Sequence, residues 1–253
     1  MALTRAGLVR PSTPDGDPGA QTRLCAGMRP VDIATMRHRL AARTRFFDEQ
    51  VLEAIHAGVV QVVIVGAGYD DRALRFRAPG VRFFEIDHPA TQSDKASRLR
   101  EMNASTGDLM LAAADFRTDD VAGVLSACGH DRTRPSLFVC EGLLVYLDGD
   151  TGIRLLAGLR ARAAPGSRLA VSLAAHRPGV PSQQAVAVAN ARRPAAAAEP
   201  WLTILTAAAY PGFLGQAGWQ VDEVLDASQL DAAVPAGRSL LVTAHPRDYS
   251  PGG

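Results

Sequence analysis

The sequence lacks the features that mark disulfide-rich, metal-binding and membrane-spanning proteins. Its 253 residues include only three cysteines. Because none of them lies in a C-x-x-C pair, we expect neither a disulfide framework nor a metal site. No stretch approaches the roughly eighteen apolar residues of a membrane-spanning helix, and residues 1–20 have no apolar core of a secretion signal. We therefore expect a cytoplasmic protein without a membrane partner.

The sequence also lacks an excess of charge of either sign. Lys+Arg number 27 and Asp+Glu 26, which gives a formal net charge of +1. This balance disfavours nucleic acid as a partner, because binding to a polyanion needs a basic surface. Lys95 is the only lysine, which indicates a GC-rich coding bias. Hydrophobic residues make up 47% of the chain and charged residues 21%, as in ordinary globular proteins, and the length suits a single domain over 1–253.

Short apolar runs alternate with longer amphipathic segments over most of the chain. The alternation predicts an α/β fold, a doubly wound and mostly parallel sheet with helices on both faces. The last two strands are expected to form an antiparallel pair at the sheet edge. The predicted strands are 61–65, 81–86, 109–113, 136–140, 168–173, 219–225 and 239–244, and the predicted helices are 90–102, 118–127, 149–163 and 206–216.

Three segments lie outside this alternation. Residues 1–30 are rich in proline and glycine and show no period, so we expect a flexible arm. Residues 31–58 carry apolar side chains at helical spacing and should form a helical cap on the core. Residues 177–218 begin with a stretch rich in proline and alanine, which predicts a substrate lid inserted in the domain.

The first strand ends in a glycine turn, Gly66-Ala67-Gly68, which resembles the start of a dinucleotide-binding fingerprint. The third glycine of that fingerprint is replaced by Asp71. Adjacent carboxylates at Asp70 and Asp71 would repel a pyrophosphate, which disfavours a nicotinamide dehydrogenase. A ligand without phosphate that carries an ammonium or sulfonium cation fits better.

Three further strands end in polar residues at the same predicted edge of the sheet. Asp87 lies nineteen residues beyond Gly68, the usual separation for an acid that binds ribose hydroxyls, and His88 follows it in the turn. Asp115 could accept the amino group of adenine while Phe116 covers the base. Glu141 and Gly142 open the segment after the fourth strand, above the site. Together these positions predict a site for a cationic nucleoside.

Four segments resemble motifs of the leucine carboxyl methyltransferase family, one of the class I S-adenosylmethionine-dependent methyltransferases. The resemblance covers about residues 37–245. One departure is Asp70-Asp71-Arg72, where the family usually has Asp-Thr-Arg. The four segments are Arg43-Thr-Arg-Phe-Phe-Asp48, Val65-Gly-Ala-Gly-Tyr-Asp-Asp-Arg-Ala-Leu74, Phe84-Glu-Ile-Asp-His-Pro89 with Lys95 downstream, and Cys140-Glu-Gly-Leu-Leu-Val-Tyr-Leu147.

The resemblance implies a Rossmann-like, seven-stranded fold with an N-terminal helical cap over the cofactor, S-adenosyl-L-methionine. It also implies a role for each site residue. Arg43 would hold the methionine carboxylate and Glu141, beside Gly142, the methionine ammonium or nearby waters. Gly66, Ala67 and Gly68 would contact the methionyl portion, Asp87 with the adjacent His88 the ribose, and Asp115 with Phe116 the adenine.

Whether catalysis needs a base depends on the methyl acceptor, because a carboxylate is ionised at neutral pH and a hydroxyl must lose its proton. His176 follows the fifth strand at the rim where an acceptor would dock, and we predict that it is the base. His38 precedes Arg43 on the same predicted helix and is a second candidate. Tyr146 is a third, as a hydroxyl that orients the substrate.

The leading hypothesis is an S-adenosylmethionine-dependent O-methyltransferase that acts on a hydroxyl or carboxyl group of a small metabolite, in secondary metabolism. The short, apolar segment 177–218 favours a small-molecule substrate over a peptide. Two alternatives remain open. One is a protein C-terminal carboxyl methyltransferase, and the other is a cofactor-binding protein that does not methylate.

Overall fold

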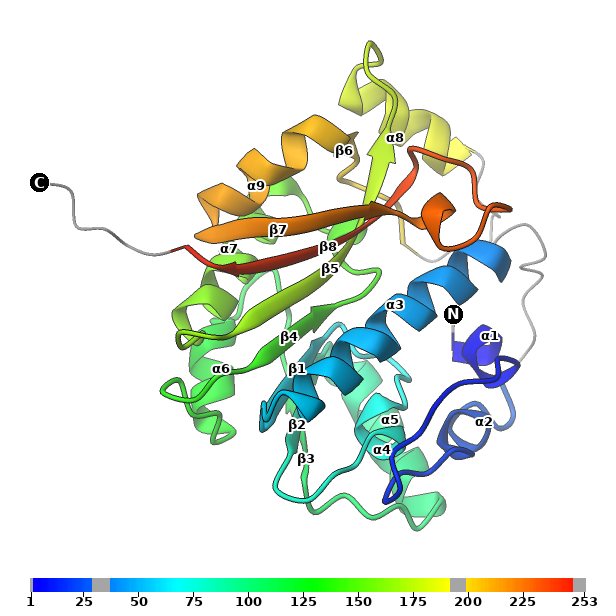
Figure 1. The fold of residues 1–253 in the computed structure, drawn as a ribbon, viewed down its shortest axis with the longest axis vertical. Helices are drawn as coiled ribbons and strands as arrows, with labels where there is room; N and C mark the ends of the chain where they lie inside the picture. Colours follow the sequence, from blue (N-terminus) through cyan, green and yellow to red (C-terminus); the bar gives the residue numbers. More distant parts are fainter. Residues whose placement is uncertain (1, 29–36, 192–198, 248–253) are drawn as a thin grey trace, which may run out of the picture.

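The computed structural model describes residues 2–28, 37–191 and 199–247, which form a central sheet with its surrounding helices (Figure 1). Seven strands follow the order β3-β2-β1-β4-β5-β8-β7, and an eighth, β6, pairs with β5 outside this order. The strands are β1 (Gln61–Val65), β2 (Arg82–Asp87), β3 (Leu109–Ala113), β4 (Leu137–Cys140), β5 (Arg168–His176), β6 (Leu205–Thr206), β7 (Trp219–Asp226) and β8 (Ser239–Pro246). The helices are α1 (Ala2–Ala6), α2 (Ala20–Leu24), α3 (Arg37–His56), α4 (Arg72–Arg75), α5 (Pro89–Glu101), α6 (Val121–Ala127), α7 (Gly149–Ala161), α8 (Ser182–Ala191) and α9 (Tyr210–Gln216).

The predicted α/β fold is confirmed. Strands β1 to β5 pair in parallel, and the predicted antiparallel pair at the sheet edge is formed by β7 and β8. The predicted strands at 61–65 and 109–113 have the observed bounds. β6 was not predicted, because a strand of two residues is too short to show a period.

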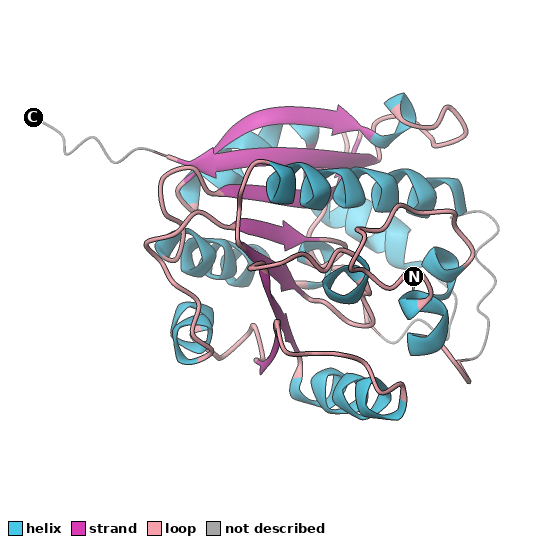
Figure 2. Cartoon of the chain, turned by 60° about the horizontal axis from the view of Figure 1, so that its bottom comes forward, coloured by secondary structure: helices cyan, strands magenta, loops and turns pink. Residues whose placement is uncertain are grey.

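Each face of the sheet has its own hydrophobic core, because successive side chains of a strand point to opposite faces. On one face, Val63 and Phe138 pack with apolar residues of α6, α7 and α9. On the other face, Val62 and Phe83 pack with apolar residues of α2, α3 and α5. Figure 2 shows the two helical layers on either side of the strands. This double coverage explains why β1 is a continuous run of buried residues.

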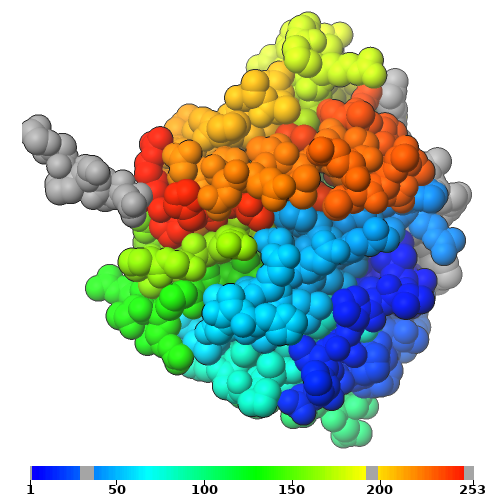
Figure 3. All heavy atoms as spheres, viewed as in Figure 1, coloured from blue at the N-terminus to red at the C-terminus, as the bar shows by residue number. Residues whose placement is uncertain are grey.

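The expectation of a loose arm over residues 1–30 is wrong for the part of it that the structure describes. Residues 2–28 contain α1 and α2 and lie flat against the rest of the molecule (Figure 3). Leu24 is fully buried in the core. Arg10 donates to the Asp48 carboxylate at 2.7 and 2.8 Å and to Asp71 at 2.6 Å. Ion pairs between residues this far apart in the chain leave no periodic signal in a segment rich in proline and glycine.

The predicted helical cap over 31–58 is represented by α3, a single helix whose buried side is packed on the sheet. The first residues of that prediction, 31–36, lie outside the described residues.

The predicted lid over 177–218 divides into two unlike parts. α8 has no buried residue, and residues 192–198 lie outside the described part of the chain. α9 is instead part of the fold. Its Tyr210, Phe213 and Leu214 are buried and it packs against β7 and α7. The lid prediction is therefore wrong for residues 210–216, where these large apolar side chains anchor the helix in the core.

Within the described ranges, no helix is long and apolar enough to cross a membrane. The same residues contain no group of three or more His, Cys, Asp or Glu side chains placed to hold a metal ion.

Candidate cofactor site

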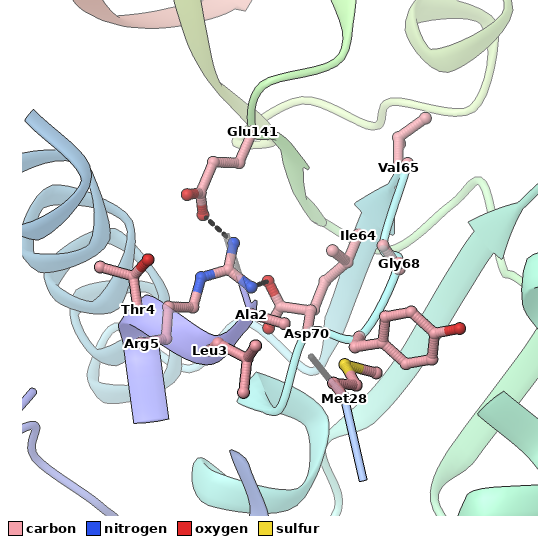
Figure 4. Close-up of a pocket in the computed structure, with 13 residues that line it drawn as sticks. Ala2, Leu3, Thr4, Arg5, Met28, Ile64, Val65, Gly68, Asp70 and Glu141 are labelled. Carbon is pink, nitrogen blue, oxygen red and sulfur yellow. Dashed lines mark ion pairs between the residues drawn. The ribbon is translucent and has the colours of Figure 1, made fainter. Parts of the chain in front are cut away.

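A cavity of about 390 Å³ lies at the carboxyl ends of β1 and β4. Its volume is within the range of small-molecule sites, roughly 300–1,000 Å³. The turn after β1, residues 66–70, forms one wall, and Glu141 at the end of β4 closes one side. The opposite wall is formed by residues 2–5 of α1, together with Met28 (Figure 4). The predicted glycine turn and Glu141 therefore line one cavity.

The turn after β1 needs glycine at two positions. Gly66 and Gly68 have φ values of +67° and +51°, a conformation that other residues rarely adopt. A Cβ atom at Gly66 would also lie 3.1 Å from the side chain of Leu143. The backbone N–H groups of Gly66 and Ala67 both donate to the carbonyl of Ile86, at 2.8 and 3.3 Å. The turn is thus fixed against β2.

Asp87 ends β2 beside this turn. Its carboxylate accepts hydrogen bonds from the backbone N–H groups of Gly68 and of His88, both at 2.6 Å. The exposed His88 caps α5 and accepts from the N–H of Ala90 at 3.3 Å through Nδ1. A carboxylate has about four lone-pair positions, so the one at Asp87 can still accept from two hydroxyl groups.

Asp115 and Phe116 follow β3, the next strand from β2 in the sheet. The carboxylate of Asp115 accepts from the backbone N–H of Arg117 at 3.0 Å, and the backbone N–H of Asp115 donates to the carboxylate of Asp119 at 2.9 Å. Phe116 is half-buried against the core. The predicted adenine residues therefore sit in an ordered turn at the same edge of the sheet as Asp87.

Glu141 lies among three arginines. Its carboxylate pairs with Arg43 at 2.9 Å, with Arg72 at 2.7 Å and with Arg5 at 2.8 Å. Burial alone would raise the pKa of Glu141, but Arg5, Arg72 and Arg43 hold it well below its usual value. Glu141 is therefore ionised, and its charge is shared with three guanidinium groups.

Asp70 and Asp71 are buried and are also paired with arginine. Asp70 pairs with Arg72 at 2.6 Å and with Arg5 at 3.1 Å, and Asp71 pairs with Arg10 and Arg75 at 2.6 and 2.7 Å. The expectation that these two carboxylates would repel a phosphate does not hold, because their charges are balanced. Asp71 stands at the position of the third glycine, and its side chain forms buried ion pairs with Arg10 and Arg75.

A family model described as leucine carboxyl methyltransferase matches residues 9–160. A protein of Streptomyces avermitilis, whose name describes an S-adenosyl-L-methionine-dependent methyltransferase, is 34% identical over 258 residues. That alignment covers 100% of this chain and 83% of the relative. The chain belongs to the leucine carboxyl methyltransferase family. It is an S-adenosylmethionine-dependent methyltransferase.

Other comparisons agree with this family and with its fold. A Streptomyces coelicolor protein, also named for such an activity, is 40% identical over 172 residues, which are 62% of this chain and 60% of the relative. A solved DUF574-family protein of Streptomyces avermitilis superposes with a TM-score of 0.62 at 18% identity, over 90% of this chain and 89% of that one. Magnesium protoporphyrin IX methyltransferase of Synechocystis, solved with bound SAH, superposes with a TM-score of 0.56 at 13% identity, over 90% and 92% of the two chains. The class I methyltransferase fold is thereby confirmed.

Lys95 on α5 supports the turn after β1. Its fully buried ammonium donates to the carbonyl of Asp70 at 2.7 Å and pairs with Glu85. Burial raises the pKa of Glu85 to about 7, against the opposing effect of the Lys95 ammonium. Lys95, the only lysine of the chain, therefore has a structural role beside the cavity. The amino-acid composition did not indicate this role.

The three candidate catalytic residues lie outside the lining of the described cavity. His176 is buried at the end of β5, where its Nδ1 lies 2.9 Å from the carbonyl oxygen of Arg177 and its Nε2 lies 3.0 Å from Ser182 Oγ. His38 is exposed and pairs with Asp231 at 2.8 Å. Tyr146 ends the 3₁₀ turn Leu144–Tyr146, which follows Glu141 in the chain.

Two of the arginines that pair with Glu141, Arg72 and Arg5, escaped the sequence-based prediction. Arg72 lies within a quoted motif, and its place four residues after Gly68 was a usable signal. Arg5 had no signal, because it lies in the segment where no structure was expected.

Proposed function

We propose that this methyltransferase transfers the methyl group of S-adenosylmethionine to an oxygen, hydroxyl or carboxyl, of a small metabolite, in secondary metabolism. One observation supports the placement of the cofactor. Across the neighbouring strands β4, β1, β2 and β3, the carboxyl ends carry Glu141, the glycine turn, Asp87 and Asp115 in that order. This order matches the order of ammonium, methionyl chain, ribose and adenine in the cofactor.

Each residue then has a proposed contact. Arg43 holds the methionine carboxylate, and Glu141 with Gly142 the ammonium. Gly66, Ala67 and Gly68 contact the methionyl chain. The chemistry of the site fits this ligand, because Glu141, a carboxylate suited to a cation, lines the cavity and pairs with the guanidinium of Arg43, a group suited to a carboxylate. Asp87 with His88, and Asp115 with Phe116, complete the nucleoside end.

The reaction is an in-line displacement. An acceptor oxygen forms a bond to the methyl carbon while the bond from that carbon to sulfur breaks, and the sulfonium becomes a neutral thioether. The protein contributes mainly by alignment of oxygen, methyl and sulfur. If the acceptor is a hydroxyl, its proton passes to a base, for which His176, Tyr146 and His38 are the candidates.

Residues 202–203, in the segment that follows β5, support a small methyl acceptor. The N–H of Leu202 donates to the carbonyl of Val145 at 2.7 Å, and the hydroxyl of Thr203 donates to the carbonyl of Leu147 at 2.6 Å. These bonds fix residues 202–203 over the 3₁₀ turn Leu144–Tyr146, next to Glu141. A covered edge at this place suits an enclosed small molecule better than an extended peptide.

Methyl-labelled cofactor tests the proposal. The protein is incubated with S-adenosylmethionine carrying a labelled methyl group, in parallel with a small-metabolite extract and with peptides that have free C-termini. Label in an oxygen-linked methyl group of a small product supports the proposal. Label confined to peptide C-termini would show the family's protein-directed reaction instead. Binding of cofactor without transfer to either pool would indicate a protein that does not methylate.

A further inference from the structure

A second cavity, of about 490 Å³, lies beside the amino-terminal end of β5. Its walls come from α3, β5, β7 and β8, and from residues 166–167 before β5. Arg168 begins β5, and His245 lies near the end of β8, which runs antiparallel to β5. The described linings of this cavity and of the cofactor cavity share no residue. The volume suits a small organic molecule.

Three carboxylates line this cavity, and two of them are neighbours in β7. Successive side chains of a regular strand point to opposite faces of the sheet. The register between β7 and β8 shifts between Val221 and Glu223, and a bulge of this kind re-aims a side chain. As a result, Asp222 and Glu223 both line the cavity. Glu53 on α3 is the third carboxylate.

The lining carries a net negative charge. Its cationic side chains, among the described residues, are Arg168 and His245. His245 Nδ1 lies 2.5 Å from the carboxylate of Asp222. The three carboxylates outnumber the cations whether or not His245 is protonated, so the charge of the lining favours a cationic ligand.

Two polar side chains of this cavity have unused hydrogen-bonding capacity. Gln50 donates from Nε2 to Glu53 Oε2 at 3.2 Å, which orients its amide, and its Oε1 is buried without a hydrogen-bond partner among the described residues. Thr243 lies opposite Glu223 and is 6% exposed, and its hydroxyl makes no hydrogen bond within the described chain. A buried polar atom without a partner is destabilising. Because Gln50 and Thr243 both line the cavity, a ligand with N–H groups can supply the missing bonds.

We propose that this cavity binds a small aliphatic polyamine through a primary ammonium group. An ammonium has three N–H donors and no acceptor, so it can donate to Gln50 Oε1, to the Thr243 hydroxyl and to a carboxylate. Among the described residues, no group of three or more His, Cys, Asp or Glu is placed to hold a metal ion, which favours an organic cation. A second copy of this chain offers no lysine, because Lys95 is its only one and is fully buried. The proposal does not depend on the function proposed for the cofactor cavity.

Calorimetry with the full chain and putrescine tests this proposal. Butanediol is a ligand of similar length without charge, and tetramethylammonium carries the charge without an N–H donor. The variants are Gln50→Met, Thr243→Val and Glu223→Gln. Gln183→Met on α8 is the matched control, because it removes an exposed amide outside the cavity.

Putrescine should bind the wild type, and its dissociation constant should rise about tenfold in Gln50→Met and about threefold in Thr243→Val. Glu223→Gln, a change at an exposed side chain, should also weaken putrescine about threefold. The control should bind putrescine as the wild type does. Butanediol should not bind, and tetramethylammonium should bind at least about tenfold more weakly than putrescine. Unchanged binding of S-adenosylmethionine in each variant shows that the variant is folded.

Three results would overturn the proposal. The first is the absence of putrescine binding to the wild type. The second is equal binding of putrescine by the wild type and all three variants, which would show diffuse attraction to an acidic surface. The third is equal affinity for putrescine and tetramethylammonium, because the hydrogen bonds to Gln50 and Thr243 would then contribute nothing.

Discussion

The carboxylate of Asp87 accepts a hydrogen bond from the backbone N–H of Gly68 at 2.6 Å and joins the end of β2 to the turn after β1. In the proposed placement the bond connects the two elements that the cofactor bridges, with its methionyl chain at the turn and its ribose at Asp87. A second N–H, that of His88, holds the other carboxylate oxygen at 2.6 Å. Asp87 is therefore oriented before any ligand binds, which reduces the ordering cost of binding.

Asp87→Ala should weaken the binding of S-adenosylmethionine by roughly a hundredfold or more. The variant removes two charge-assisted hydrogen bonds to the ribose, each worth about 1.5–3 kcal/mol. Isothermal titration calorimetry measures the effect. Asp87→Asn keeps an acceptor for the Gly68 N–H and separates loss of the ribose contact from loss of the turn. Asp108→Ala is the control, because this exposed residue precedes β3 at the opposite edge of the sheet. An unchanged dissociation constant for Asp87→Ala would place the ribose elsewhere.

Arg43→Lys should also weaken the cofactor roughly tenfold, although the charge is kept. A guanidinium can bind a carboxylate through two parallel hydrogen bonds, whereas an ammonium acts as a point charge. Arg43 already donates from Nε to Glu141 at 2.9 Å, which orients the guanidinium at the site. The comparison is Arg45→Lys, two residues further along α3, where the side chain is exposed. If only the Arg45 variant loses affinity, the carboxylate contact has been assigned to the wrong arginine.

The sequence predicted the parts of the molecule that repeat a local pattern. β1 was found because all five of its residues are buried, which makes its apolar run continuous. Gly66, Asp87, Asp115 and Glu141 were found together because parallel strands bring their carboxyl ends to one edge.

The parts that escaped prediction depend on contacts between distant residues. Arg5 reaches Glu141, and Arg10 reaches Asp71, 61 residues away, so neither pair has a local signature. α9 was taken for part of a lid because the segment before it is rich in alanine and proline, yet its Tyr210 and Leu214 are buried. The burial of a few large side chains decides whether such a segment belongs to the core, and the composition of the segment does not show that burial.

Above pH 7, where Glu85 is ionised, Lys95→Met should destabilise the protein by about 3–5 kcal/mol, because it leaves the fully buried Glu85 carboxylate without its counter-charge. It also removes the hydrogen bond to the Asp70 carbonyl, so cofactor affinity should fall as well. Urea denaturation and calorimetry measure the two effects. The double variant Lys95→Met with Glu85→Leu should recover much of the stability but not the affinity, since it leaves no buried charge and no hydrogen bond to the turn. Full recovery of both stability and cofactor affinity in the double variant would show that Lys95 only neutralises Glu85.

Glu85 should make the stability of the fold depend on pH. Burial raises its pKa from the ordinary 4.5 to about 7 in the folded protein, with Lys95 opposing the shift and Asp70 and Asp87 adding to it. Between these two pH values the unfolded chain has lost a proton that the folded chain keeps, so stability falls as the pH rises through this window. The stability of the wild type relative to Glu85→Gln should fall by up to about 1.4 kcal/mol per pH unit.

Denaturation at a series of pH values measures this difference, with Glu101→Gln at the exposed end of α5 as the control. A difference that rises with pH would mean that Lys95 keeps Glu85 ionised in the folded state.

His176→Ala tests the predicted base. The Arg177 carbonyl can only accept, so Nδ1 carries the proton, and Nε2 is left as the acceptor that faces Ser182 Oγ at 3.0 Å. If the methyl acceptor is a hydroxyl and transfers its proton to Nε2, the variant should lower the turnover roughly a hundredfold or more and leave the cofactor affinity unchanged. Ser182→Ala is the matched control, because it removes the hydrogen bond to Nε2 and keeps the base. Turnover should survive in that control.

If both variants keep full turnover on a hydroxyl substrate, His176 only fixes the start of α8, and the base is to be sought at Tyr146 or His38. A carboxylate acceptor gives a different pattern, since it is ionised at neutral pH and the His176 variant then keeps its rate.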